Sequence, residues 1–454
     1  MIPLEQVLLL IVAAPGVSFL LLGSAWLLGV QVGERIVARF TSFIFLLITA
    51  ASAWLSWSML SGGLATVSLN GGPWFQAGGY AFPLDIVADR LSLPLIALTA
   101  MLVGIVGSFS GRYLHREKGF QRFFLLLHLF AFGSMLVFSA GSFDLLVGGW
   151  ELVGITSALL VAFFHQRRDP VRSSMHVFSI YRIGDLGLLL GVFVLHYLGG
   201  TAKDSHLFAG SWPMQSTNLT PLAATLTGLL FLFAAAAKSA QVPFFGWLPR
   251  AMEGPTPSSA IFYGAISIHA GAYLLLRIEP ILIASPVASS AVIAVGLLSA
   301  VVGTLAHRVV ADAKTSIAYA AMTQVGIIFV EIGLGFPRLA LAHMIGHAIV
   351  RTLQFLRAPS MLHDYHRVHA AAGGHLATTG DHYHRLLPES VRLWAYRFAL
   401  HRGFYDAFVH RLAVSPVLRL SQWLASFEPG AKVPVPGSTM IQLPEINTLE
   451  RTNA

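Results

Sequence analysis

The feature that most constrains this chain is a series of apolar stretches, each long enough to cross a lipid bilayer as a helix. Apolar residues make up 55% of the 454 positions and charged residues only 11%, against about 25% charged in an ordinary soluble domain. The sequence therefore predicts an all-α polytopic membrane protein of about eleven transmembrane helices. The predicted spans are 7–30, 39–60, 91–111, 123–140, 143–165, 174–198, 222–241, 257–277, 288–307, 314–335 and 339–358.

The basic residues of the connecting loops set the expected orientation. The loops 112–122 and 166–173 are rich in Arg and Lys, whereas 61–87 has none and 199–219 has one. Since cytoplasmic loops carry the excess of basic residues, we expect the N-terminus outside and the C-terminus in the cytoplasm, with the chain in a bacterial inner (plasma) membrane. The N-terminal stretch lacks the basic leader and cleavage site of a signal peptide, so it is expected to be a retained span.

Three regions are predicted along the chain. Residues 1–84 hold the first spans and most of an external segment, 61–87, whose alternation of polar and apolar residues around Asn70-Gly71-Gly72 is typical of a short β-hairpin. Residues 85–358 form the core. Residues 359–454 form a cytoplasmic segment, amphipathic over 389–427, that suits the membrane surface or a docking partner.

Composition narrows the partners and cofactors. The chain has no Cys, which excludes disulfides and thiolate metal sites. We predict no metal and no other cofactor on this chain, and for the His-rich tract 363–384 we favour a basic docking surface over a metal site. The net charge of +8 is explained by basic cytoplasmic loops, so the lipid bilayer is an expected partner and nucleic acid is not.

Four ionisable side chains stand inside otherwise apolar spans: Glu151, Lys238, His343 and His347. A charged group at the middle of a bilayer costs about 2.5–3.5 kcal/mol on insertion scales. Residues retained at such a cost usually mark a path for ions or protons.

A broken helix is predicted near 242–257, directly after Lys238. Four prolines prevent one continuous helix from Lys238 to Arg277; they are Pro243, Pro249, Pro255 and Pro257. Irregular backbone at this depth is tolerated where it is buried in protein or lines a wet cavity. Lys238 is therefore a candidate titrating group, with a lysine that extends to the membrane surface as the alternative.

His343, His347 and Arg351 recur at i, i+4 and i+8, so they lie along one helical stripe. Two neutral imidazoles one turn apart can pass a proton near working pH. A metal pair, or two histidines satisfied by backbone carbonyls, are the alternatives.

Arg182 and Asp185 are spaced i, i+3, so a structural ion pair on one helix is expected. Glu151 has no partner nearby in the sequence and needs one from another helix, for which Lys238 and Lys314 are the candidates.

Four segments, in this order, resemble the antiporter-like membrane subunits found in respiratory complex I (its large distal proton-pumping subunit) and in Mrp cation/proton antiporters. The resemblance covers about 85–358, and the segments are GWELVGITSALL, AKSAQVPFFGWLPRAMEGPTPSSA, KTSIAYAAMTQVG and HMIGHAIVRTLQFL. It implies a proton or cation path in which Glu151 matches the essential glutamate of the family, Lys238 its central lysine and Lys314 the lysine of the next helix bundle. His343 and His347 would match its histidine pair.

The chain departs from that family at several positions. Tyr263 stands at a common histidine position, and His269, which we add to the predicted path, comes one helical stretch later. Arg351 replaces the usual lysine, and because a guanidinium hardly deprotonates, it is expected to hold charge rather than relay a proton. A twelfth, broken span with the outermost lysine of the family is not found, which places a complete exit path in doubt.

The segment RTLQFLRAPSMLHDYH, residues 351–366, is most similar to the DabB family, the membrane subunits of bacterial inorganic-carbon accumulation complexes. That resemblance implies a cytoplasmic partner similar to DabA, a zinc protein related to β-carbonic anhydrases. Any zinc and any CO₂ hydration chemistry would then belong to the partner.

Three functions stay open on the sequence alone. The first is a non-enzymatic membrane subunit that conducts protons or Na⁺ to drive inorganic-carbon (CO₂/bicarbonate) uptake with the zinc partner. The second is a proton- or Na⁺-translocating subunit of a complex I-like or Mrp-type complex. The third is a non-conducting membrane anchor for a cytoplasmic enzyme.

Overall fold

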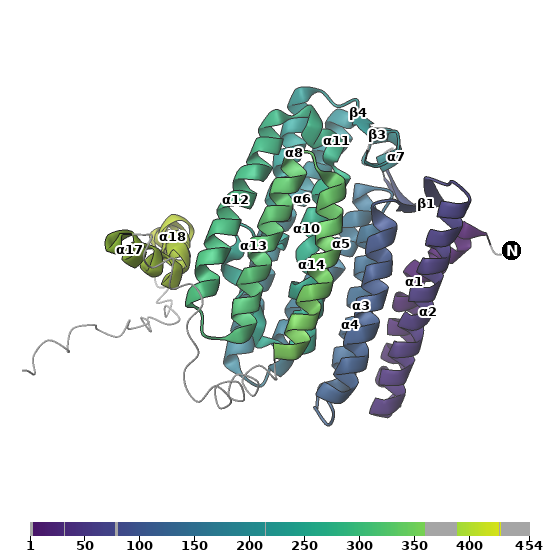
Figure 1. Ribbon diagram of the computed structural model, residues 1–454, viewed down its shortest axis with the longest axis horizontal. Helices are drawn as coiled ribbons and strands as arrows, with labels where there is room; N and C mark the ends of the chain where they lie inside the picture. Colours follow the sequence, from purple (N-terminus) through teal and green to yellow (C-terminus); the bar gives the residue numbers. More distant parts are fainter. Residues whose placement is uncertain are drawn as a thin grey trace, which may run out of the picture. The chain divides into compact units, whose positions relative to one another are not determined.

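The computed structural model describes residues 3–30, 32–77, 80–213, 215–358, 388–425 and 427. Eleven helices in the described part of the chain are long and apolar enough to span a membrane, and they stand side by side as one bundle (Figure 1). The predicted all-α polytopic fold is thus confirmed, and each predicted span corresponds to one of these helices. The spanning segments are α1 (Leu4–Leu27), α2 (Glu34–Ser61), α3 (Ser92–Tyr113), α4 (Phe120–Ser139), α5 (Phe143–Val161, with a 3-10 turn to Phe164), α6 (Arg168–Gly199), α8 (Pro221–Lys238), Thr256–Arg277, α12 (Pro286–Val309), α13 (Ala313–Gly333) and α14 (Pro337–Arg357).

The eighth spanning segment is built from three pieces. A single turn, α9 (Thr256–Ser259), leads into a π-helical stretch, Ala260–Ala265, and then into α10 (Ile266–Arg277). All twelve residues of α10 are buried. Because α10 has no free face, every polar side chain on it points at another part of the protein.

The chain between α8 and α9 is irregular, as the prolines predict. Only two short 3-10 turns, Phe245–Trp247 and Arg250–Glu253, interrupt it. Side chains satisfy the backbone at this break. The indole of Trp247, within the irregular segment, donates to the carbonyl of Ala237 near the end of α8 at 2.9 Å, and the amide of Val242 donates to the hydroxyl of Ser299 on α12 at 2.9 Å. Such partners are what allow non-helical backbone at membrane depth.

A two-stranded antiparallel hairpin, β1 (Thr66–Ala77) and β2 (Tyr80–Asp89), joins α2 to α3. The predicted hairpin is present, but Asn70-Gly71-Gly72 does not turn the chain. The strand register shifts between Asn70 and Pro73, so this stretch is a bulge within β1, and the strands meet at Ala77 and Tyr80. Gly72, with a φ of 74°, supplies the local positive φ that a bulge needs, and its amide donates to the side-chain oxygen of Asn70.

The end of the bundle that carries this hairpin also carries a short helix α7 (Asp204–Leu207), a second small sheet β3 (Phe208–Ala209) with β4 (Ser216–Thr217), and α11 (Glu279–Ala284) (Figure 1). We call it the hairpin end. Loop charges predict that it faces outside. Backbone bridges from Ile86 to Ala140 and from Ser142 to Lys203 tie its loops together.

Helices α12 and α13 approach closely at a pair of glycines. A Cβ on Gly296 would lie 2.5 Å from the carbonyl oxygen of Gly326, and one on Gly326 would lie 2.6 Å from that of Gly296. Small residues at such crossings let two membrane helices pack at short distance.

The described residues fall into two compact units, Met1–Gly403 and Phe404–Ala454. The amphipathic segment predicted over 389–427 is largely helical but not one continuous helix. α17 (Glu389–Leu400) is followed by a 3-10 turn in which Gly403 has a φ of 66°, and then by the helical segments α18 (Tyr405–Val409) and α19 (Ser415–Ala425). The His-rich tract 363–384 lies outside the described residues, and the three-region division remains a prediction.

The glycine contact predicts a stability effect. Gly296→Ala forces α12 and α13 apart and is expected to cost about 1–3 kcal/mol, the usual range for overpacking. The unfolding temperature of the detergent-solubilised protein should fall by several degrees. Gly346→Ala on α14 is the matched control, because a Cβ there meets nothing within 4 Å. Equal unfolding temperatures for the two variants would contradict this packing.

Candidate functional site

The ammonium group of Lys238 is buried at the C-terminal end of α8, where its residue is 1% exposed. Its Nζ donates to the carbonyl oxygen of Trp150 at 3.0 Å and lies 4.9 Å from the ring of Trp150 and 4.6 Å from that of Tyr181. The salt bridges of the described residues include none to Lys238. The group is therefore held by a carbonyl dipole and two aromatic faces, which stabilise a cation more weakly than a carboxylate does.

Beside Lys238, two carboxylates share one guanidinium. Arg182 on α6 pairs with Glu151 on α5 and also with Asp185, at 2.8 Å, one turn along its own helix. The indole of Trp150 donates to the second oxygen of Asp185 at 2.8 Å. The expected Arg182–Asp185 pair is present. The partner of Glu151 is Arg182, however, and not Lys238 or Lys314.

Lys314, at the first turn of α13, has a different contact. Its Nζ donates to the carbonyl oxygens of Met252 and Gly254, at 2.6 and 2.8 Å. It therefore fastens the end of the irregular segment that begins after Lys238. The structure does not bring Lys314 into contact with Glu151 or Lys238.

A directional hydrogen-bond chain runs through the histidines. The Nε of Arg351 donates to Nε2 of His347 at 3.2 Å, so Nδ1 of a neutral His347 carries the proton. That Nδ1 lies 2.9 Å from Nε2 of His269, whose own Nδ1 contacts the carbonyl oxygen of Ala265. One set of neutral tautomers satisfies all three bonds. The π-helical turn before α10 brings the Ala265 carbonyl within reach of His269, a use of π-bulges common at functional sites.

His343 is not hydrogen-bonded to His347; their ring centroids are 6.4 Å apart. Its Nδ1 instead lies 2.9 Å from the carboxylate of Glu331, and its Nε2 lies 3.0 Å from the side-chain oxygen of Gln324. Both partners are on α13. Both nitrogens of this ring therefore have an oxygen partner on α13.

The lysine and histidine groups are separated by buried polar atoms. Ser239 packs directly against Gly271 of α10, two residues from His269, and Gln241 reaches Gly326 of α13. The Ser239 hydroxyl, the Gln241 side-chain oxygen and the Tyr263 hydroxyl have no hydrogen-bond partner among the described residues. Because buried polar groups of this kind are usually satisfied by ordered water, this region suits a hydrated connection.

Sequence reasoning missed two members of these groups. Glu331 stands in IIFVEIGLGF, where an acidic residue in an apolar run is itself a signal. Trp150 acts through its backbone carbonyl and its indole, and a tryptophan in a membrane span gives no such signal. Of the predicted residues, the structure joins His269 with His347 and Arg351, and Glu151 with Arg182 and Asp185.

The described chain is a membrane bundle with an irregular segment between α8 and α9 and with ionisable side chains inside it, as the resemblance to antiporter-like subunits implies. Residues 140–379 match the family described as NADH:quinone oxidoreductase/Mrp antiporter, and residues 74–124 match the NADH-ubiquinone oxidoreductase (complex I) chain 5 N-terminus. The first match covers more than half of the chain. The chain belongs to the NADH:quinone oxidoreductase/Mrp antiporter membrane family.

Relatives and solved structures agree with this assignment. NADH-quinone oxidoreductase subunit L of Neisseria meningitidis is 32% identical over 351 residues, 75% of this chain and 52% of that protein. NADH-ubiquinone oxidoreductase chain 5 of Allomyces macrogynus is 30% identical over 79% of this chain and 55% of its own length. The chain thus spans about half the length of these curated relatives.

Among solved structures, the Mrp complex from Dietzia sp. aligns with a TM-score of 0.64 and 26% identity, over 76% of this chain and 37% of that chain. The archaeal membrane-bound sulfane sulfur reductase aligns with a TM-score of 0.61 and 22% identity, over 77% and 70%. The second likeness shows the shared fold alone.

The shared guanidinium predicts a non-additive response to mutation. Arg182→Gln leaves the carboxylates of Glu151 and Asp185 without their shared cation and should cost about 2 kcal/mol. This is less than for a fully buried pair because the side chains of Arg182 and Glu151 are 36% and 33% exposed, although that of Asp185 is 5% exposed. Glu151→Gln keeps the Arg182–Asp185 pair and should cost less. The double variant should regain at least half of the Arg182→Gln loss, measured as unfolding temperature in detergent. A double variant as unstable as the sum of the two would contradict the shared arrangement.

Proposed function

We propose that this chain translocates protons across the membrane as one subunit of a multi-subunit, complex I- or Mrp-type assembly. The observation that carries the proposal is the ammonium of Lys238, buried in the bundle without a carboxylate contact and beside a glutamate that is paired elsewhere. A lysine held in this way can gain or lose a proton when the Glu151–Arg182 pair opens or closes, because the charges on those neighbours affect the stability of its ammonium form.

The path we propose has two groups in series. Glu151, Arg182 and Asp185 set the charge around Lys238, and His269, His347 and His343 form the second group. Lys314 supports the irregular segment between them, and Arg351 fixes the tautomers of the histidine chain. Moving one charge across the membrane is worth about 2.3 kcal/mol per 100 mV, so even one proton per cycle can drive a substantial conformational change in a neighbour.

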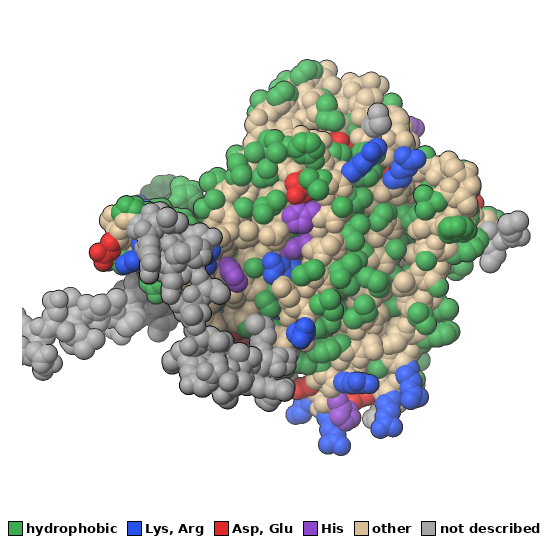
Figure 2. Space-filling model, viewed as in Figure 1, with side chains coloured by type: hydrophobic (Ala, Val, Ile, Leu, Met, Phe, Trp, Pro, Cys, Tyr) green, Lys and Arg blue, Asp and Glu red, His purple; other side chains and the backbone are tan. Residues whose placement is uncertain are grey.

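The assignment to a larger assembly is supported by a polar strip on the membrane-facing surface. Figure 2 shows acidic, histidine and basic side chains exposed over the part of the bundle that holds α13 and α14. The side chains of Glu331 and His343 are 15% and 23% exposed, and Arg351 is half-buried. Charged groups in contact with lipid tails cost several kcal/mol, so this strip is better suited to the surface of another membrane helix.

An inorganic-carbon role is the second candidate function. It is supported by the resemblance of residues 351–366 to the DabB family, and it needs a cytoplasmic zinc partner of the DabA type. The relatives that match most of this chain are complex I and Mrp subunits, which is why the carbon role comes second. A non-conducting anchor is disfavoured because an anchor has no use for four ionisable groups inside membrane spans, two of which, Lys238 and His347, are buried.

Lys238→Met should lower proton flux at least tenfold. The readout is acidification of liposomes, reported by a trapped pH dye under an imposed membrane potential, with the full chain and its co-purifying subunits. Lys118→Met is the control, because Lys118 lies exposed in the loop between α3 and α4. Unchanged flux in both variants would make the chain an anchor rather than a translocating subunit.

The carbon role has a separate test. Cells that lack carbonic anhydrase and require high CO₂ would receive this chain together with the protein encoded beside it. The proton-subunit proposal predicts no growth in air. Growth that is abolished by an uncoupler and by Lys238→Met, at unchanged expression, would instead establish the gradient-driven carbon role.

A further inference from the structure

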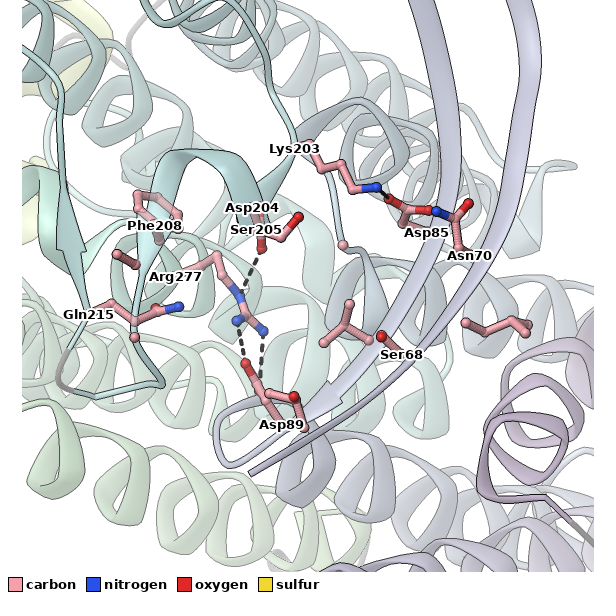
Figure 3. A pocket seen from close by; sticks show the side chains of 16 residues that line it. Ser68, Asn70, Asp85, Asp89, Lys203, Asp204, Ser205, Phe208, Gln215 and Arg277 are labelled. Atoms are coloured by element: carbon pink, nitrogen blue, oxygen red, sulfur yellow. Dashed lines mark hydrogen bonds and ion pairs between the residues drawn. The ribbon is translucent and has the colours of Figure 1, made fainter. Parts of the chain in front are cut away.

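A polar cavity of about 460 Å³ opens at the hairpin end, between β1–β2 and the segment 203–215. Figure 3 shows that carboxylates and cationic side chains from three separate parts of the chain point into it. Neither the sequence motifs nor the path through Lys238 uses these residues. The side chains of Asp85, Asp89 and Arg277 are almost entirely enclosed, whereas those of Lys203 and Asp204 are 24% and 16% exposed.

Three carboxylates and two cations line this cavity: Asp85, Asp89, Asp204, Lys203 and Arg277. Lys203 pairs with Asp85 at 2.5 Å, and Arg277 pairs with Asp89 at 2.6 Å. Asp204 is left at the edge of the Arg277 guanidinium, 3.8 Å from its Nε. With all five groups ionised the cavity carries one excess negative charge, so one proton neutralises it.

Asp204 is the group placed to take that proton. Burial raises the pKa of the Asp204 carboxyl to about 7, against the attraction of Arg277 that lowers it. Asp89, which holds the close contact with Arg277, has a pKa lowered from its usual value. The two carboxylates therefore differ in role, because one is fixed as an anion and the other can exchange a proton near neutral pH.

The carboxylate of Asp85 also lines the cavity. Asp85 is 4% exposed, and its Oδ1 has no hydrogen-bond partner among the described residues. An enclosed carboxylate oxygen of this kind is costly unless it is solvated. It indicates that the cavity exchanges water or ions with the solution at this end.

The cavity is connected to the histidine chain through α10. His269, Tyr273 and Arg277 recur at i, i+4 and i+8, so they lie along one stripe of that fully buried helix. Arg277 donates to the hydroxyl of Tyr273 at 3.0 Å, and Tyr273 donates to the carbonyl of Phe138 at 3.0 Å. Eight residues of helix place Arg277 about 12 Å from His269, close enough for a charge at one to alter proton affinity at the other about tenfold in a protein interior.

We propose that this cavity is the outer proton port of the translocation path, with Asp204 as its proton-exchanging group. Gain or loss of the Asp204 proton changes the net charge around Arg277, about 12 Å along α10 from His269, and so couples the port to that histidine. This inference deepens the proposed function and rests on it, because a port requires a translocation path. The exchange itself is a simple protonation: the carboxylate of Asp204 takes one proton from the outside solution, or returns it. Arg277 keeps its proton throughout.

The first test measures the port without measuring transport. The chain has no Cys, so Ser205→Cys introduces a single thiol at the cavity. Membrane-impermeant cationic and anionic thiosulfonates are added from outside to right-side-out vesicles, and the ratio of their rates reports the local charge. Thiol ionisation affects both rates equally and cancels in the ratio.

We expect the cation preference to rise at least threefold as pH increases through about 7, because Asp204 then becomes an anion. Asp204→Asn should abolish this rise. Glu279→Gln is the matched control: Glu279 lies on α11 at the same end, its pKa is likewise raised by burial to about 7, and it does not line the cavity. A rise that persists in Asp204→Asn, or a thiol that never reacts from outside, would overturn the port.

Proton flux is then compared in the same variants and in Lys238→Met. The port predicts an approximately tenfold slower flux in Asp204→Asn and unchanged flux in Glu279→Gln. Flux that depends on Lys238 but not on Asp204 would overturn the port and leave the proposed function standing. Flux that is independent of Lys238 would overturn the proposed function, and the labelling result would then decide alone whether the cavity exchanges a proton. Labelling that follows Na⁺ concentration rather than pH would also overturn a proton port.

Discussion

The interruption of the chain after Lys238 is the constraint on which the rest of this structure depends. Unpaired backbone groups cannot remain in a bilayer, so side chains must supply their partners. Ser299 of α12 and Lys314 of α13 bind the irregular segment, and Trp247 within that segment binds a carbonyl near the end of α8. The same interruption ends α8 at Lys238 and leaves its ammonium in the middle of the bundle. The same break in the helix thus determines both which backbone groups need side-chain partners and where the ammonium of Lys238 lies.

The ionisable side chains inside the bundle form two different arrangements. Around Lys238 one guanidinium serves two carboxylates, so the charges are close together. Around His269 and His347 the rings are hydrogen-bonded to each other, and Arg351 donates to the outer nitrogen of His347. The first arrangement responds to net charge and the second to the position of protons. Coupling between them would therefore be electrostatic over part of its length and proton transfer over the rest.

The membrane spans could be predicted from the sequence because an apolar stretch or a proline break depends only on residues that are close together in the chain. The eleven helices and the irregular segment follow directly from those patterns. The contacts between helices could not be predicted in this way. The stripe of His343 and His347 predicted a proton passing between them, whereas His347 faces His269 on another helix. Likewise, a lysine was predicted as the partner of Glu151, whereas Glu151 pairs with Arg182. Spacing along one helix cannot show which face another helix covers, and these pairings depend on that.

The hydrogen-bond chain through the histidines is closed at both ends. Arg351 occupies the outer nitrogen of His347 with a proton it does not release, and the backbone carbonyl of Ala265 occupies the far nitrogen of His269. A proton could therefore pass along these two rings only after the guanidinium had moved away and the second ring had turned from its carbonyl. Those two movements involve different helices, α14 and α10.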